Sequence, residues 1–144
     1  MNDSGIFGMG YEGRDISAVL KELDAMGAAV LVDVRLNPVS RKRGLSKKAL
    51  AEALSNAGIE YRHMRALGNP RDNRAGFAET TGQAADDARR GYADILTQPD
   101  AAAALDELTD LARKERVAVL CYEASELHCH RREVLAVVRS RLDG

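Results

Sequence analysis

The sequence has few cysteines and no long apolar run. Cys121 and Cys129 are the two cysteines among its 144 residues, no Cys-x-x-Cys pair occurs, and no apolar leader follows a basic N-terminus. A secreted scaffold held together by disulfides is therefore not indicated. No apolar stretch approaches the roughly eighteen residues of a membrane span. We expect a protein of the reducing cytoplasm that makes no contact with a membrane.

Neither sign of charge dominates the chain. Charged residues make up 30% of it and the formal net charge is −1, which is typical of an ordinary folded surface. A disordered chain, or a protein that coats nucleic acid with its whole surface, is not expected from these values. With 45% hydrophobic residues, residues 1–144 suit a single domain that buries roughly two thirds of the surface that the unfolded chain exposes.

Short valine-rich runs alternate with helical patterns along the chain. Residues 28–34 (AAVLVDV) and 117–122 (VAVLCY) have the continuous apolar character of strands that are buried on both faces, as in parallel sheets. Residues 59–64 alternate in character and predict a strand nearer the sheet edge, and residues 5–9 predict a short first strand. The segments with helical spacing or caps are Asp15 to Gly27, Ser46 to Gly58, residues 84–96, residues 100–114 and a last helix around Val134 to Leu142.

This alternation predicts an α/β fold. We expect a single three-layer domain with a mostly parallel sheet of about four strands and helices on both faces. In such sheets, ligands bind outside the carboxyl ends of the strands, where loops meet helix starts. Residues 68–82 (GNPRDNRAGFAETTG) have no period, and a loop of this length indicates either a lid or binding loop or a disordered segment.

The segment 121–132, CYEASELHCHRR, is the strongest candidate for a site because basic residues stand at the start of its helix. Cations are disfavoured at the positive end of a helix dipole, and a bound anion would remove that cost. The helix amides already favour an anion, and Arg131 could add a two-pronged contact to a phosphate, sulfate or carboxylate. Cysteine is nucleophilic in such surroundings, so Cys129 is a candidate nucleophile and His130 a candidate acid or base. Glu123, at the end of the preceding strand, is a candidate general base.

Structural roles are open for the same residues. Cys129 also suits a small buried cap, and Glu123 a solvated loop carboxylate. Arg131 could pair with Glu126 or Glu133.

A metal site formed by Cys121, His128, Cys129 and His130 is a further alternative, because thiols and imidazoles are common zinc ligands. The spacing argues against it. Structural zinc sites usually pair ligands two to four residues apart on two knuckles, whereas here three ligands are adjacent and Cys121 falls in a strand. We therefore expect no metal and no cofactor, and a mainly structural role for Cys121.

A second group of polar residues follows the strand at 28–34. Asp33 ends a strand too apolar for an unpaired carboxylate, so we expect it to pair with Arg35, Arg131 or a backbone amide, in a structural or a catalytic role. From residue 35 to residue 48 every charged residue is a cation, which points to a phosphate-bearing ligand such as a nucleotide or nucleic acid. A solvated cationic loop explains the same run. The cations are Arg35, Arg41, Lys42, Arg43, Lys47 and Lys48.

Residues 8–13, GMGYEG, match the G-x-G-x-x-G pattern of dinucleotide-binding proteins, and Asp33 stands twenty residues after Gly13, where a ribose acceptor would lie. The strand before Gly8 would be only a few residues long, and the helix begins at Asp15, after the glycines. Nicotinamide nucleotide binding is therefore the weaker alternative.

Five short motifs together resemble one known family. They are DVRLNPVS (33–40), GIEYRH (58–63), LG (67–68), LCYE (120–123) and CHR (129–131). On these motifs nearly the whole chain resembles the bacterial family called domain of unknown function 488. The resemblance implies an α/β domain of uncharacterised activity, in which a single glycine, here Gly10, ends the first strand. The chain differs from the usual family pattern at Tyr122, where a small residue is common, and at Asn69, where a second glycine is usual. The implied site positions are Asp33, Arg35, Pro38, Ser40, Glu123, Cys129, His130 and Arg131.

These patterns favour binding of a phosphate-bearing ligand, a nucleotide or nucleic acid, at the carboxyl edge of the sheet, with Cys/His-dependent hydrolase or transferase chemistry. One alternative is a non-catalytic nucleic-acid-binding module that uses residues 35–48. Another is an interaction module in which the CHR segment only completes the core. The predicted catalytic residues are Cys129, His130, Asp33 and Glu123. The predicted anion-binding residues are Arg35, Ser40, Arg41 and Arg131.

Overall fold

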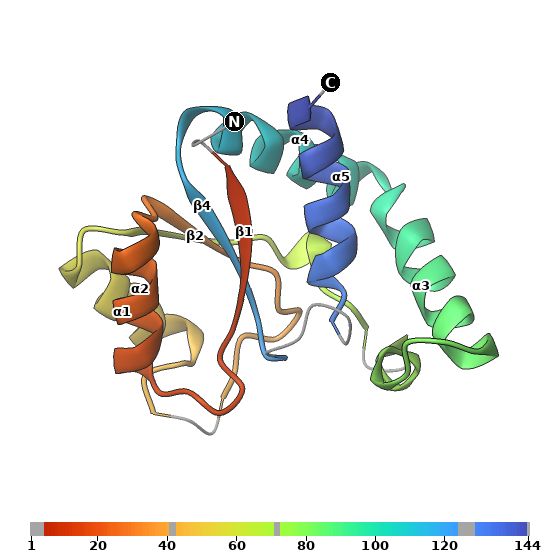
Figure 1. The fold of residues 1–144 in the computed structure, drawn as a ribbon, viewed down its shortest axis with the longest axis horizontal. Helices are drawn as coiled ribbons and strands as arrows, with labels where there is room; N and C mark the ends of the chain where they lie inside the picture. Colours follow the sequence, from red (N-terminus) through yellow and green to blue (C-terminus); the bar gives the residue numbers. More distant parts are fainter. Residues whose placement is uncertain (1–4, 41–42, 71–72, 124–128, 144) are drawn as a thin grey trace.

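A computed structural model describes residues 5–40, 43–70, 73–123 and 129–143. They form a four-stranded parallel sheet between two layers of helices (Figure 1). The predicted α/β fold is confirmed. The strands are β1 (Ile6–Gly10), β2 (Val30–Asp33), β3 (Glu60–His63) and β4 (Val117–Cys121). The helices are α1 (Ile16–Met26), α2 (Lys47–Asn56), α3 (Gln83–Leu96), α4 (Pro99–Lys114) and α5 (Arg131–Asp143), with short 3-10 turns η1 (Arg65–Leu67) and η3 (Ala75–Ala78).

The strand order is β1-β4-β2-β3, so the last strand of the chain lies inside the sheet between β1 and β2. In β4, Val119 lies opposite Gly8 on one side and Val32 on the other. Both β2 and β4 are buried along their whole length, which explains why their sequences are continuously apolar. β3 pairs with β2 at the edge of the sheet, where the alternating pattern of residues 59–64 predicts it.

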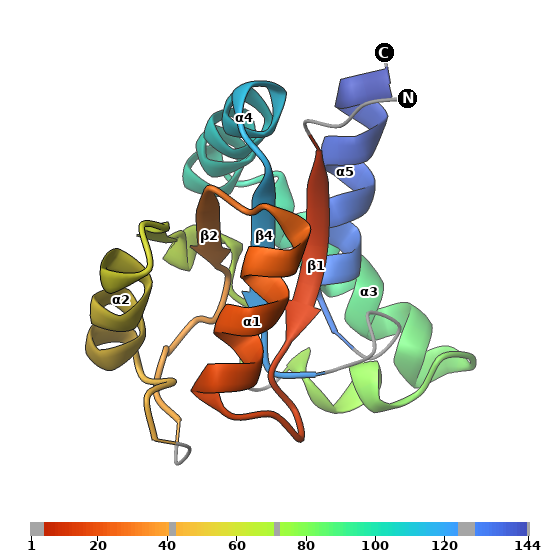
Figure 2. The ribbon, with the colours of Figure 1, turned by 60° about the vertical axis from the view of Figure 1, so that its left-hand side comes forward.

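The two faces of the sheet belong to two separate hydrophobic clusters. Val32 and Val119 pack with residues of α3, α4 and α5, whereas Leu31 and Leu120 pack with residues of α1 and α2. Figures 1 and 2 show α1 and α2 on one side of the sheet and α4 and α5 on the other. Since successive side chains of a strand point to opposite faces, a strand that is apolar throughout needs helices on both sides. None of the helices in the described part of the chain is long and apolar enough to cross a membrane.

Local signals set the ends of the first two helices in different ways. The Asp15 carboxylate accepts a hydrogen bond from the Ala18 amide at 2.9 Å, and Gly27 ends α1 with a left-handed φ of 67°. Ser46 stands at the N-cap of α2, but its hydroxyl bonds to Ser40 instead of to the helix. It accepts from the Ser40 amide at 2.9 Å and donates to the Ser40 carbonyl at 3.2 Å. Ser46 thus fixes the loop after β2 to the start of α2.

The glycines of GMGYEG do not form a phosphate-binding turn. Gly8 and Gly10 lie inside β1, and α1 begins only at Ile16, after the Asp15 cap. A dinucleotide fingerprint requires its glycines to lie between the strand and the start of the helix. The sequence match to the dinucleotide-binding pattern therefore arises by chance, and the structure does not support it.

Candidate functional site

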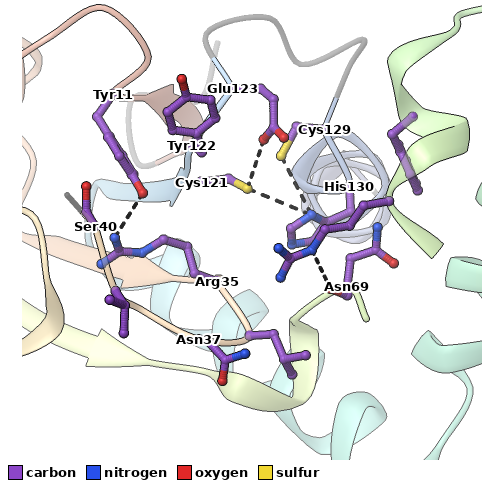
Figure 3. A pocket seen from close by; sticks show the side chains of 14 residues that line it. Tyr11, Arg35, Asn37, Ser40, Asn69, Cys121, Tyr122, Glu123, Cys129 and His130 are labelled. Carbon is purple, nitrogen blue, oxygen red and sulfur yellow. Dashed lines mark hydrogen bonds between the residues drawn. The ribbon is translucent and has the colours of Figure 1, made fainter. Parts of the chain in front are cut away.

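A cavity of about 450 Å³ opens where the parallel strands end (Figure 3). Its wall comes from the loops after β1, β2 and β3, from the end of β4 with the two residues that follow it, and from the two residues before α5. This is the edge at which open parallel sheets bind ligands. The volume lies within the range of roughly 300–1,000 Å³ that is common for small-molecule sites.

The structure brings some of the predicted site residues to this cavity and places others behind it. Asp33 and Arg131 are buried but are not part of the cavity wall, and Arg41 lies outside the described residues. The predicted residues that line the cavity are Arg35, Ser40, Glu123, Cys129 and His130.

Asp33 and Arg35 form a buried ion pair. The Asp33 carboxylate accepts from Arg35 Nε at 2.8 Å and Nη2 at 2.7 Å, and from the Tyr61 hydroxyl at 2.7 Å. Arg35 Nη1 donates to the Leu45 carbonyl at 2.7 Å and to the Tyr11 hydroxyl at 3.2 Å. Asp33 therefore holds Arg35 in place and neutralises its charge.

The ion pair shifts the titration of its members. Burial lowers the pKa of Arg35, but the hydrogen bonds with Asp33 and its charge more than reverse this, so the pKa lies above the ordinary value. Burial and the hydrogen bond to Asp33 raise the pKa of Tyr61. Arg35 stays charged and Tyr61 stays neutral across the physiological range.

Arg131 begins α5 with its side chain inside the protein. Only 1% of Arg131 is exposed, and Nη1 donates to the Met9 carbonyl at 3.1 Å and to the Glu123 carbonyl at 2.6 Å. The cation at the helix start is thus stabilised by carbonyl oxygens at the ends of β1 and β4. Arg131 ties the start of α5 to the strand ends, which sets the position of the preceding two residues.

Cys121, Cys129 and His130 meet at the cavity, as Figure 3 shows. His130 Nδ1 lies 3.8 Å from Cys121 Sγ and 3.7 Å from Cys129 Sγ. His130 Nε2 lies 2.9 Å from the Val34 carbonyl, which can only accept, so Nε2 carries a proton, and in the neutral ring Nδ1 presents a lone pair to the sulfurs. The three donor atoms lie within 4.8 Å of one another, and among the described residues they form the group that could hold a metal.

The surroundings of this group shift the pKa values of Cys121 and His130. The hydrogen bond with Cys129 and burial raise the pKa of Cys121, so Cys121 is a neutral thiol that donates to Glu123 Oε2 at 3.4 Å. Burial lowers the pKa of His130, but hydrogen bonds to Cys121 and to the Val34 carbonyl oppose this, and the net direction is upward. The Tyr92 ring stands edge-on to the imidazole, with ring centroids 5.1 Å apart, and helps to fix its plane.

Arg74 also lines the cavity, although the sequence does not single it out. It comes from the loop after η1, where charges of both signs are mixed. Arg74 Nε donates to the Asn69 carbonyl at 3.1 Å. The Asn73 amide group donates to the Asn69 side chain and to the Ala88 carbonyl, both at 2.9 Å, which ties the loop to α3. In the sequence, the feature that could have pointed to Arg74 is the long loop at residues 68–82, which indicates either a lid or binding loop or a disordered segment.

A comparison with protein-family models matches residues 15–138 to the family described as Domain of unknown function DUF488. The chain belongs to this family. The family that the sequence analysis suspects is therefore confirmed. Comparisons with curated proteins and with solved structures found no match.

The two positions that the sequence analysis expects to differ from the usual family pattern, Asn69 and Tyr122, both lie at the cavity wall. Asn69 lines the cavity beside Arg74, and Tyr122 lines it while remaining 45% exposed. Tyr122 stacks edge-on against Tyr11, with ring centroids 5.3 Å apart and an interplanar angle of 81°. The Arg35 guanidinium carbon lies 5.3 Å from the centroid of the Tyr11 ring. An aromatic pair thus forms one wall of the cavity in this chain.

Proposed function

We propose that this DUF488 domain binds a small phosphate-bearing ligand in the cavity at the strand ends and acts on it as a hydrolase or transferase. The observation that carries the proposal is the set of side chains that lines this cavity of about 450 Å³. Guanidinium groups, amide and hydroxyl groups, and a thiol–imidazole group all face it. Sites in which a few polar groups converge on a partly apolar cavity are the usual form of small-molecule sites.

Arg74 is the main cation of the proposed anion site. It is exposed, and its Nε is held by the Asn69 carbonyl, which leaves the two-pronged end of the guanidinium as the group offered to a phosphate. Arg35 contributes hydrogen-bond donors more than charge, because Asp33 neutralises it. Ser40 lines the same wall, and Ser46 fixes its backbone. The anion-binding role of Arg41 stays a prediction from the sequence.

The proposed chemistry belongs to Cys129, His130 and Glu123. His130 Nδ1 lies 3.7 Å from Cys129 Sγ and offers a lone pair in its direction. Glu123 is the carboxylate beside them, with Oε2 3.4 Å from Cys121 Sγ. Asp33 and Arg131 support this group indirectly, by holding Arg35 and the start of α5.

The test is calorimetric titration of the purified chain with inorganic phosphate and with a nucleoside monophosphate. We expect saturable binding that Arg74→Ala weakens by roughly 10–100-fold, because a hydrogen bond to a charged group contributes about 1.5–3 kcal/mol. Arg90→Ala is the matched control: Arg90 is exposed on α3, pairs with Asp87 at 3.5 Å and does not line the cavity. Absence of saturable binding, or an equal loss in both variants, would contradict the proposal.

Nucleic-acid binding by residues 35–48 is the alternative function, and three exposed cations favour it. Arg43, Lys47 and Lys48 are exposed at and before the start of α2, whereas Arg41 and Lys42 lie outside the described residues. In this reading, a labelled oligonucleotide binds with an affinity that falls steeply with salt. The double substitution Lys47→Ala/Lys48→Ala then lowers the salt slope and Arg74→Ala does not. Binding that is lost only in Arg74→Ala assigns the phosphate contact to the cavity instead.

A further inference from the structure

The donor group formed by Cys121, Cys129 and His130 is assembled from two separate segments. Cys121 is the last residue of β4, and the other two residues directly precede α5. Their exposed fractions are 5%, 2% and 7%, yet all three line the cavity, which provides a path from solvent. The spacing in the sequence argues against a metal site, but in the fold the end of β4 and the start of α5 lie side by side, and the three donor atoms lie within 4.8 Å of one another.

The separations between the imidazole nitrogen and the two sulfur atoms match a tetrahedral zinc ion. Zinc bonds of about 2.3 Å to sulfur and about 2.0–2.1 Å to nitrogen place a sulfur and a nitrogen ligand roughly 3.6 Å apart. His130 Nδ1 lies 3.7 Å from Cys129 Sγ and 3.8 Å from Cys121 Sγ. Both sulfur–nitrogen separations thus fit zinc. The ion also needs the two sulfur atoms about 3.8 Å apart, and they lie within 4.8 Å of each other, so a movement of about 1 Å at most completes the site.

Hydrogen bonds outside the group orient two of its ligands. A histidine that binds a metal through one ring nitrogen usually donates the other N–H to a carbonyl or a carboxylate, which fixes the ring and the tautomer. His130 makes this contact through Nε2 to the Val34 carbonyl at 2.9 Å. The Arg131 amide donates to Cys129 Sγ at 3.4 Å, which holds that sulfur at the helix start.

The charge of the group also suits a divalent ion. On binding, both thiols release their protons to solvent, and two thiolates with a neutral imidazole balance the charge of Zn²⁺. A buried site with no net charge avoids the large cost of an uncompensated ion. Sulfur and imidazole ligands favour zinc over the harder ions Mg²⁺ and Ca²⁺.

We propose that the chain binds one zinc ion through Cys121 Sγ, Cys129 Sγ and His130 Nδ1, with the fourth position open to the cavity. Three protein ligands and an open position are the pattern of catalytic zinc sites. Glu123 stands beside this position, with Oε2 3.4 Å from Cys121 Sγ, as the acceptor for a proton of a zinc-bound water. Cys129 and His130 then act on the ligand through the metal and not as a free thiol and base. The zinc site itself does not depend on the phosphate proposal.

A disulfide between Cys121 and Cys129 is the competing use of the two sulfurs. A disulfide brings its sulfur atoms to about 2.05 Å of each other and leaves the His130 lone pair without a partner. Both cysteines are free thiols in the structure, and His130 Nδ1 stands at nearly equal distances from them. This placement favours the metal.

The experiment uses the reduced full-length chain, stripped with a chelator and kept free of phosphate compounds. Zinc is titrated against a colorimetric chelator, and cobalt is added separately as a spectroscopic probe. We expect one ion per chain, together with the thiolate-to-cobalt charge-transfer band and the d–d bands of tetrahedral cobalt. Outer partners of metal ligands contribute about 10–100-fold to affinity, so loss of a ligand in Cys129→Ser or His130→Gln is expected to cost more than about 100-fold.

His63→Gln is the matched control because His63 is half-buried, bonds to the Arg35 carbonyl at 2.7 Å and lies outside the donor group. It is expected to bind zinc like the wild type, and circular dichroism checks that each variant is folded. The wild-type chain alone also decides the question: no uptake of one ion, or a cobalt spectrum without thiolate bands, overturns the site. Two oxidised cysteines in chain purified without reductant and containing no metal would assign them to a disulfide. Because no phosphate is present, these results stand whether or not the cavity binds an anion.

Discussion

Removal of Arg35 provides a quantitative test of the buried ion pair beneath the cavity. In Arg35→Ala, the Asp33 carboxylate loses the donors at 2.8 and 2.7 Å and keeps the Tyr61 hydroxyl and the backbone amide of residue 35. Asp33 is fully buried behind Arg35, and water that enters from the cavity in place of the guanidinium supplies hydrogen bonds but no compensating charge. The variant therefore leaves a carboxylate poorly compensated in an apolar environment.

The expected loss in the free energy of unfolding is about 3–5 kcal/mol, which is the usual cost of removing one partner of a buried pair. For a chain of this size, roughly 2–4 °C of melting temperature corresponds to each kcal/mol, so the midpoint falls by about 10 °C. An exposed ion pair contributes at most about 1 kcal/mol. The losses in the free energy of unfolding expected for a buried and for an exposed ion pair thus differ by more than the error of a denaturation experiment.

Urea unfolding followed by far-ultraviolet circular dichroism measures this loss. Arg90→Ala, which breaks the exposed pair with Asp87, is the control and should change stability by less than about 1 kcal/mol. Adding Asp33→Asn to Arg35→Ala should restore part of the stability, because the stranded charge is then absent. An Arg35→Ala loss no larger than that of the control would refute the assignment of a buried, energetically important pair.

Two further predictions concern the same region. Gly68→Ala should lower the free energy of unfolding by about 1–3 kcal/mol, because a Cβ at this position would lie 2.6 Å from Leu36 Cα, and urea unfolding would contradict the close approach if the loss were below about 0.5 kcal/mol. The pKa of Tyr61 is higher in the folded chain than its unfolded value of about 10, so the contribution of the neutral hydroxyl is complete below pH 10 and is lost as the pH rises through the folded-state pKa. The stability advantage of the wild type over Tyr61→Phe should therefore shrink above about pH 10, and an advantage that stays constant in unfolding curves across that range would show that Tyr61 does not titrate as proposed.

Much of the fold follows from local patterns in the sequence. The continuous apolar runs around Val32 and Val119 predict central strands because only burial on both faces accepts apolar side chains at successive positions. Asp15 and Gly27 predict the ends of α1 because a carboxylate cap and a left-handed glycine satisfy backbone groups within a few residues. These effects are local, so a single sequence is enough to recognise them.

The candidate site could be predicted only in part. The parallel strands imply that Arg35, Glu123 and His130 meet at one edge of the sheet, and all three line the cavity. The direction of a long cationic side chain depends on acceptors that are far away in the sequence. Arg131 finds one at the Met9 carbonyl, which turns its guanidinium inward, and no local pattern indicates this. Arg74 was missed because charges of both signs surround it in the sequence.

The sequence by itself determined which donor atoms the chain has and that its polar segments follow buried parallel strands. Only the tertiary structure decided that Cys121, at the end of β4, joins Cys129 and His130, because the order β1-β4-β2-β3 and the packing of α5 set the distances between these atoms. Caps and periodicity depend on neighbours within a few residues. A donor group assembled from two segments depends on how helices and sheet pack, and that packing is settled by the whole core.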